Sequence, residues 1–294
     1  MSSGALSPQE ATHAILKTGL HHLYEPTQLM FIKNVYGGLL VGFGGVLSQI
    51  ASKGAVGLQA SNPGLVRLIQ GATFPVSLIC AYTVGAEFVT AYPMWLVMTG
   101  FERKGKPMQY IRAILVPWAG NFVGALFSAL VFSYSTGVLT EEPYRSGIVA
   151  QITVNIVERQ WHIIFVRSIG CGFLITLSMF LGTQFLDGIS KALGLHLPFF
   201  VSIVAAFPHT VEIMYDAFLG MLLGAPLSIP AFFFHCLLPV TLGNFVGGAV
   251  FTGAYFWYVN ICCEDGEKVK DWFEGVFGMP VMNGNAYGNG SIDA

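Results

Sequence analysis

Gly120-Asn121-Phe122-Val123-Gly124 and Gly243-Asn244-Phe245-Val246-Gly247 are two copies of one string, GNFVG, in a chain of 294 residues. Each copy lies inside a long apolar stretch and follows a proline by a few residues. The recurrence predicts an internal repeat, with a first half at about 30–134 and a second at about 160–259. Transporters and channels are often built from two related halves that meet at the permeation path. The repeat therefore favours passage of a solute over chemistry.

The composition places the chain in a lipid bilayer. Hydrophobic residues make up 54% of it and charged residues only 10%, whereas a soluble domain carries about 25% charged residues. Runs of the roughly 20 apolar residues that span a bilayer occur at about 30–51, 68–100, 111–132, 161–182, 198–223 and 229–259. We therefore expect an all-α integral membrane protein with six transmembrane helices.

Three regions follow from this pattern: an N-terminal segment at 1–28, a six-span transport domain at 29–260 and a tail at 261–294. The first region has no apolar core with a small-residue cleavage site, so we expect no removed signal peptide. Lysine and arginine are modestly enriched on the side of the N-terminus, which usually marks the cytoplasmic face. We expect both termini to be cytoplasmic and the asparagine- and glycine-rich end of the tail to be disordered.

The second predicted span is interrupted by polar and helix-breaking residues. Gly85, Glu87 and Thr90 lie in an otherwise apolar run and are followed by Pro93, which is suited to open a new half-helix. Irregular backbone at membrane depth must be shielded from lipid. We predict a broken helix here, with Glu87 accepting backbone N–H bonds that hold the loop.

The fifth predicted span is interrupted at the corresponding place. Pro208 is suited to the first turn of a half-helix that runs to about residue 223. His209, Glu212 and Asp216 then share one face of that helix, at spacings of three and four residues. Ionisable groups at mid-membrane usually face a pathway or the interior of a bundle. The three residues are candidates for a proton relay, although a lone histidine in a span is often only a hydrogen-bonded core residue.

The motifs at these breaks resemble those of the formate/nitrite transporter family. The resemblance covers about 30–258, and its specific parts are the loop Gly85-Ala86-Glu87-Phe88-Val89-Thr90, both GNFVG strings, Leu238-Pro239 and Phe165-Val166-Arg167-Ser168-Ile169-Gly170-Cys171. The pair Trp161-His162 is most similar to the fungal branch.

The resemblance implies an aquaporin-like inverted repeat, with broken second and fifth helices, that assembles as a plasma-membrane homopentamer with one pore in each protomer. It implies that a small monovalent anion, such as formate, nitrite or another short monocarboxylate, passes with a proton. His209 matches the central histidine of the family and Thr90 the loop threonine near it. Phe88 and Val89 match the residues of an apolar neck, which the solute crosses as the neutral acid because an anion is costly to desolvate.

The chain departs from the family pattern at the central site. Pro208 stands where the family has an acidic residue, and Gly172 and Ile213 stand where it has asparagines. Asn121 and Asn244 remain, and with Gly85 and Glu87 they are the predicted anchors of the loops. These losses leave two alternatives open: an aquaporin-like channel for neutral solutes, and a membrane sensor or scaffold that transports nothing.

Other classes of function are not supported by the residues. No metal-ligand spacing and no pair of nucleophile and base is visible, so we expect no enzyme, no cofactor and no metal site. The net charge of −2 is too small to favour nucleic acid as a partner. The expected partners are a small monovalent anion, a proton, other copies of the chain and membrane lipid.

Overall fold

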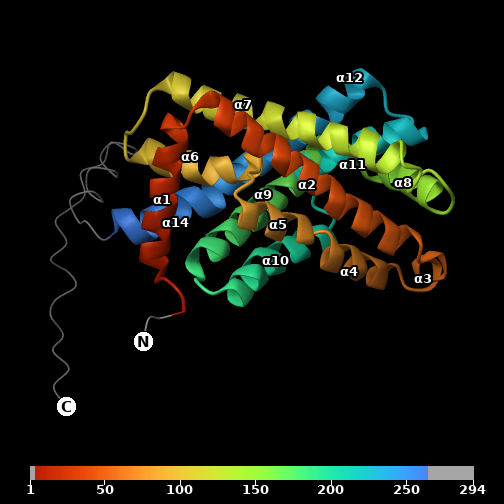
Figure 1. Ribbon diagram of the computed structural model, residues 1–294, viewed down its shortest axis with the longest axis horizontal. Helices are drawn as coiled ribbons and strands as arrows, with labels where there is room; N and C mark the ends of the chain where they lie inside the picture. Colours follow the sequence, from red (N-terminus) through yellow and green to blue (C-terminus); the bar gives the residue numbers. More distant parts are fainter. Residues whose placement is uncertain (1–3, 264–294) are drawn as a thin grey trace, which may run out of the picture.

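Helices dominate residues 4–263, the part of the chain described by the computed structural model (Figure 1). The helices are α1 (Pro8–Tyr24), α2 (Thr27–Lys53), α3 (Val56–Ser61), α4 (Pro63–Thr73), α5 (Val76–Val84), α6 (Tyr92–Phe101), α7 (Pro107–Phe127), α8 (Tyr144–Ile152), α9 (Trp161–Gln184), α10 (Gly188–Val204), α11 (Thr210–Leu223), α12 (Ile229–Ala231), α13 (Leu238–Val246) and α14 (Tyr255–Trp257). Between them lie a 3₁₀ turn, η1 (Val89–Ala91), and the π-helical stretches η2 (Ser128–Tyr134), η3 (Thr153–Val157), η4 (Phe232–Leu237), η5 (Gly247–Ala254) and η6 (Tyr258–Cys262).

Five helical runs in the described part are long and apolar enough to cross a membrane: Thr27–Lys53, Pro63–Val84, Pro107–Tyr134, Trp161–Gln184 and Ile229–Cys262. The remaining predicted span is divided between α10, which is apolar but has only 17 residues, and α11. The predicted class, a helical membrane protein with interrupted second and fifth spans, is confirmed.

Both interruptions begin with a residue in the left-handed backbone region. Gly85 ends α5 with φ of 77°, which glycine adopts without steric cost. Ala206 follows α10 with φ of 54°, and its side chain makes this conformation less favourable by roughly 1–2 kcal/mol. The prediction that Pro208 lies in the first turn of a half-helix is wrong, because α11 begins at Thr210 with His209 as its N-cap.

The glycines of the two GNFVG strings bring helix backbones together. Figure 1 shows α7 beside α2, and there a Cβ on Gly124 would overlap the carbonyl oxygen of Val35. In the second half a Cβ on Gly247 would overlap the carbonyl oxygen of Ile169 on α9. The two strings therefore make the same kind of contact, in which small residues let membrane helices approach closely.

Helix α1 precedes the first span and packs on the membrane domain. Its start is fixed by a capping box, in which the Ser7 hydroxyl accepts from the backbone of Glu10 and the Glu10 carboxylate accepts from the backbone of Ser7. Its buried side chains, Ala11, Ile15 and Leu23 among them, belong to a cluster with residues of α6. Most of the described part of the segment predicted at 1–28 is thus helical, whereas most of the predicted tail, residues 264–294, lies outside the described residues.

We expect Gly247→Ala to lower the thermal unfolding midpoint of the purified protein by several degrees, since overpacking costs about 1–3 kcal/mol. The overlapped atom belongs to the backbone of α9 and has little room to move. Gly188→Ala is the matched control, because a Cβ there meets no atom within 4 Å. Equal midpoints for the two variants would contradict the close-packing role of the string.

Candidate functional site

Asn121 of the first GNFVG string binds the interrupted backbone of its own half. Its side-chain Oδ1 accepts a hydrogen bond from the backbone N–H of Val89, 2.7 Å away. Its Nδ2 donates to the carbonyl oxygens of Asn34 and Glu87, at 2.7 and 2.9 Å. One side-chain amide thus pairs with both the N–H of Val89 and the C=O of Glu87, two backbone groups that the break leaves without a partner in a helix.

Asn244 does the same in the second half. Its Oδ1 accepts from both the backbone N–H and the hydroxyl of Thr210, each at 2.8 Å. Its Nδ2 donates to the carbonyl oxygens of Ser168 and Pro208, at 2.8 and 3.1 Å. Both asparagines are completely buried. Asn121 binds the residues on either side of Phe88, and Asn244 binds the residues on either side of His209. Phe88 and His209 are therefore equivalent positions in the two halves.

The side chains of Thr90 and His209 meet between the two breaks. The Thr90 Oγ1 lies 2.7 Å from His209 Nε2, and both residues are completely buried. His209 Nδ1 lies 3.4 Å from the backbone nitrogen of Glu212, which can only donate. This contact favours the neutral ring with its hydrogen on Nε2, the tautomer that donates to Thr90. The sequence placed these two residues in one pathway, and the structure brings them into contact.

Aromatic rings flank the imidazole. The ring of Phe88 lies 5.9 Å from it and the ring of Phe199, on α10, lies 5.3 Å from it, both edge to face. Val89, the other predicted neck residue, is completely buried beside Phe88. Phe199 was not predicted, because nothing in its sequence neighbourhood shows that α10 places it against the histidine. The imidazole thus contacts two apolar rings, with Thr90 and the N-terminus of α11 as its polar contacts.

The carboxylates of the predicted relay have different hydrogen-bond partners. Glu212 caps α11, since its carboxylate lies 3.4 Å from the backbone nitrogen of His209. Asp216 is 3% exposed and accepts at 3.1 Å from the side-chain amide of Gln49. Both carboxylates line a cavity of about 660 Å³ that also reaches Pro208. Glu212 is thus hydrogen-bonded to His209, and Asp216 to Gln49.

The positions that depart from the family pattern have a packing explanation. A Cβ on Gly172 would overlap the backbone of Asn244, so glycine here lets α9 and α13 approach. Ile213 is 7% exposed and belongs to the main apolar cluster. Asn121 and Asn244 bind both breaks without help from these two positions.

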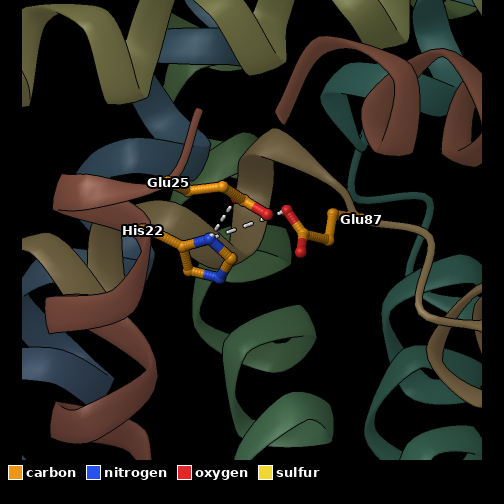
Figure 2. A group of neighbouring side chains, drawn as sticks. All are labelled: His22, Glu25 and Glu87. Atoms are coloured by element: carbon orange, nitrogen blue, oxygen red, sulfur yellow. Dashed lines mark hydrogen bonds and ion pairs between the residues drawn. The ribbon is translucent and has the colours of Figure 1, made fainter. Parts of the chain in front are cut away.

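An unforeseen charged cluster joins α1 to the first break. His22 of α1, Glu25 and Glu87 turn their polar atoms toward one another (Figure 2). Lys33 Nζ lies 2.6 Å from Glu25 Oε1 and 3.0 Å from Glu87 Oε1. The Glu87 carboxylate also accepts from the hydroxyl of Tyr92 at 2.5 Å. The prediction that this carboxylate accepts backbone N–H bonds is wrong, since side chains fill that role.

The same cluster has a spacing suited to a metal ion. Nδ1 of His22 and carboxylate oxygens of Glu25 and Glu87 lie within 4.8 Å of one another. The ammonium of Lys33 contacts both carboxylates and supplies a positive charge there. A metal ion would be repelled by this ammonium, so we assign the cluster to structure.

We expect Glu25→Gln to lower the thermal midpoint at neutral pH, since removing one partner of a buried ion pair costs about 3–5 kcal/mol. Burial raises the pKa of the Glu25 carboxyl, but hydrogen bonds and charges from Lys33 and His22 outweigh burial and hold that pKa below its ordinary value. This stabilisation is complete above the unfolded pKa of about 4.3 and is lost as the pH falls through the lowered folded value.

The measurement is the thermal midpoint between neutral pH and about pH 3 for wild type, Glu25→Gln and the exposed control Glu141→Gln. Wild type and control should lose stability toward acid more steeply than Glu25→Gln. Parallel curves for all three proteins would show that the cluster does not stabilise the fold.

Comparison with known proteins places this arrangement in one family. The family model described as "Formate/nitrite transporter" matches residues 9–258. A "Probable formate transporter" of Methanothermobacter thermautotrophicus is 30% identical over 278 residues, which cover 89% of this chain and 99% of that protein. An uncharacterized transporter of Saccharomyces cerevisiae is 26% identical over 91% of this chain, which spans only 43% of that relative.

Solved structures share the fold. An "FNT family ion channel" superposes with a TM-score of 0.76 at 23% identity, covering 85% of this chain and 98% of that one. A "Pentameric formate channel with formate bound" gives 0.71 at 22% identity, covering 79% and 97%. The relatives are transporters and channels rather than enzymes. With a family model that matches most of its length and a relative at 30% identity, this chain is a member of the formate/nitrite transporter family.

Proposed function

We propose that the protein is a channel or proton-coupled transporter for small monovalent anions, formate, nitrite or related short monocarboxylates. The observation that carries the proposal is the contact of a buried, neutral His209 with Thr90 between two broken helices. The family and the names of two relatives, a probable formate transporter and a formate channel, support the class of solute.

The chemistry of the neck follows from its apolar walls. A bare anion between the rings of Phe88 and Phe199 would lose its hydration without compensation, which is costly. An anion of a weak acid that takes up a proton before it enters the neck avoids this cost of desolvation. Passage as the neutral acid therefore couples the solute to a proton, whichever way it moves.

His209 is suited to deliver that proton through Thr90. In the tautomer with hydrogen on Nε2 the ring donates to the threonine 2.7 Å away, whose own hydroxyl hydrogen can then be donated to an oxygen of the anion. A proton that arrives at Nδ1 would let Nε2 release its own, so that the ring returns to a neutral tautomer. Glu212, whose backbone nitrogen lies beside Nδ1 and whose side chain lines the cavity, is the carboxyl group that we assign as its source.

The assembly and its placement are part of the same proposal. The likeness to a pentameric formate channel supports a homopentamer in which each protomer contains one pore. The charge bias of the loops supports cytoplasmic termini, and we place the protein in the plasma membrane. Gly85, Glu87, Asn121 and Asn244 hold the loops that form the neck.

The proposal is tested by uptake of labelled formate, nitrite, acetate and lactate into proteoliposomes across an imposed pH gradient. Uptake should rise with an inward proton gradient. His209→Phe should lower it at least about 100-fold, the range of general acid–base contributions. His196→Phe is the matched control, since His196 is only partly buried and its contacts are the carbonyl of Ala72 and the ring of Phe200 among the described residues. No uptake of any solute by well-folded pentamers would overturn the proposal and favour a sensor or a neutral-solute channel.

The role of Glu212 has a separate test. Glu212→Gln keeps the size and an acceptor oxygen for the N-cap bond to His209 but carries no exchangeable acid proton. We expect its rate of formate uptake to lose the rise toward acid pH that wild type shows, while the thermal midpoint changes little. An unchanged pH profile would exclude Glu212 as the proton source.

A further inference from the structure

The side-chain amides of the two GNFVG strings align the halves of the chain residue by residue. The amide of the first string donates to the carbonyl oxygen of Asn34, and that of the second to the carbonyl oxygen of Ser168. The carbonyls that the last glycine of each string approaches belong to the next residue along the chain in both halves, which supports the same alignment. The cations that directly precede these acceptors, Lys33 and Arg167, are therefore equivalent positions.

In the first half, the cation has two carboxylate partners. The ammonium of Lys33 lies 2.6 Å from Glu25 Oε1 and 3.0 Å from Glu87 Oε1. The position equivalent to Glu87 is Pro208, because the two amides donate to these carbonyl oxygens as well. Glu25 lies eight residues before Lys33, and the residue at that distance before the equivalent cation is Arg159. The second half thus has a proline and an arginine where the first half has two carboxylates.

This exchange leaves the guanidinium of Arg167 without a carboxylate. No hydrogen bond or ion pair binds it within the described residues, and the charges that act on it are those of Arg159 and Arg67. The Nε atom of Arg159 is buried and also lacks an acceptor in the described part of the chain. Buried donors without an acceptor are costly, and guanidiniums that repel one another favour an anion between them.

The cavity gives a solute access to these cations. Arg167 and Arg67 both line it, and it extends to the second break. Two carboxyl groups, Glu212 and Asp216, line the same cavity. The ammonium of Lys53 offsets the charge of Asp216, and Glu212 is the proton donor of the function proposed above and is uncharged in that role. Neither carboxyl group therefore takes the place of the missing partner of Arg167.

We propose that Arg167, supported by the charges of Arg67 and Arg159, binds the solute anion in the cavity and selects a planar anion with two oxygen atoms on one carbon or nitrogen. A guanidinium presents paired N–H donors in a fixed fork, which matches both oxygens of a carboxylate or of nitrite. A halide offers a single centre and gains less from the fork. The proposal rests on the function proposed above, since Arg167 holds the anion in the cavity that Glu212 lines before the anion takes up a proton.

The test is the thermal midpoint of the purified full-length protein at neutral pH, with sodium formate replacing sodium chloride at constant ionic strength. Formate in large excess should raise the midpoint of wild type by several degrees, because a ligand that binds only the folded state stabilises it. Arg167→Gln should bind formate at least about tenfold more weakly, and Arg167→Lys should bind less well than wild type because an ammonium has no fork. Arg103→Gln is the matched control, since Arg103 is exposed and lies outside the cavity lining.

A second pair of variants rebuilds the carboxylate of the first half. Pro208→Glu should pair with Arg167 as Glu87 pairs with Lys33, and thereby abolish the rise with formate although the arginine is present. The glutamate also regains a backbone N–H, which at the equivalent position donates to the carbonyl of Lys33 at 3.3 Å. Pro208→Gln has the same size without the charge and should respond to formate as wild type does.

Each outcome decides the proposal. It is overturned if formate does not raise the midpoint of wild type, if Arg167→Gln shows an equal rise, or if sodium sulfate raises the midpoint more than formate does. If Arg167→Gln does not fold, the difference between Pro208→Glu and Pro208→Gln decides instead. A rise that depends on Arg167, without any uptake into proteoliposomes, leaves the anion site standing and refutes the transport function. Uptake whose KM is unchanged in Arg167→Gln leaves transport standing and refutes the site.

Discussion

The hydrogen bonds that Asn121 and Asn244 make to interrupted backbone are the constraint on which the rest of the structure depends. A break in a membrane helix leaves N–H and C=O groups unpaired where no water can reach them, at several kcal/mol each. One amide on a neighbouring continuous helix pairs with a donor and an acceptor at once. The neighbouring glycines matter for the same reason, since only close backbones bring the amide within reach.

The two breaks together build a site that neither half contains. The first contributes Phe88 and Thr90, and the second contributes His209 at the N-cap of α11. Since both loops are held at fixed points, the hydroxyl and the imidazole meet at 2.7 Å with aromatic rings beside them. Proton donation inside an apolar neck is the chemistry that this geometry favours.

Charge is distributed unevenly around that neck. Toward α1, Lys33 lies between the carboxylates of Glu25 and Glu87 and ties the N-terminal helix to the first break. Toward the cavity, Asp216 accepts from the side-chain amides of Gln49 and Gln151, and Glu212 caps α11. A cation is thus the partner of the carboxylates in the first cluster, whereas amides are the partners of Asp216 in the second.

Composition and motifs alone determined that the chain is a helical membrane protein with two related, interrupted halves, because hydrophobicity and GNFVG are local properties of the sequence. They also singled out His209 and Thr90. Only the tertiary structure decided that Phe199 faces the imidazole, that Gln49 binds Asp216 and that Lys33 bridges two carboxylates. The two residues of each pair lie far apart in the sequence, so their contact depends on how the helices cross. The crossing is set by how small residues pack between helices, and sequence spacing does not encode it.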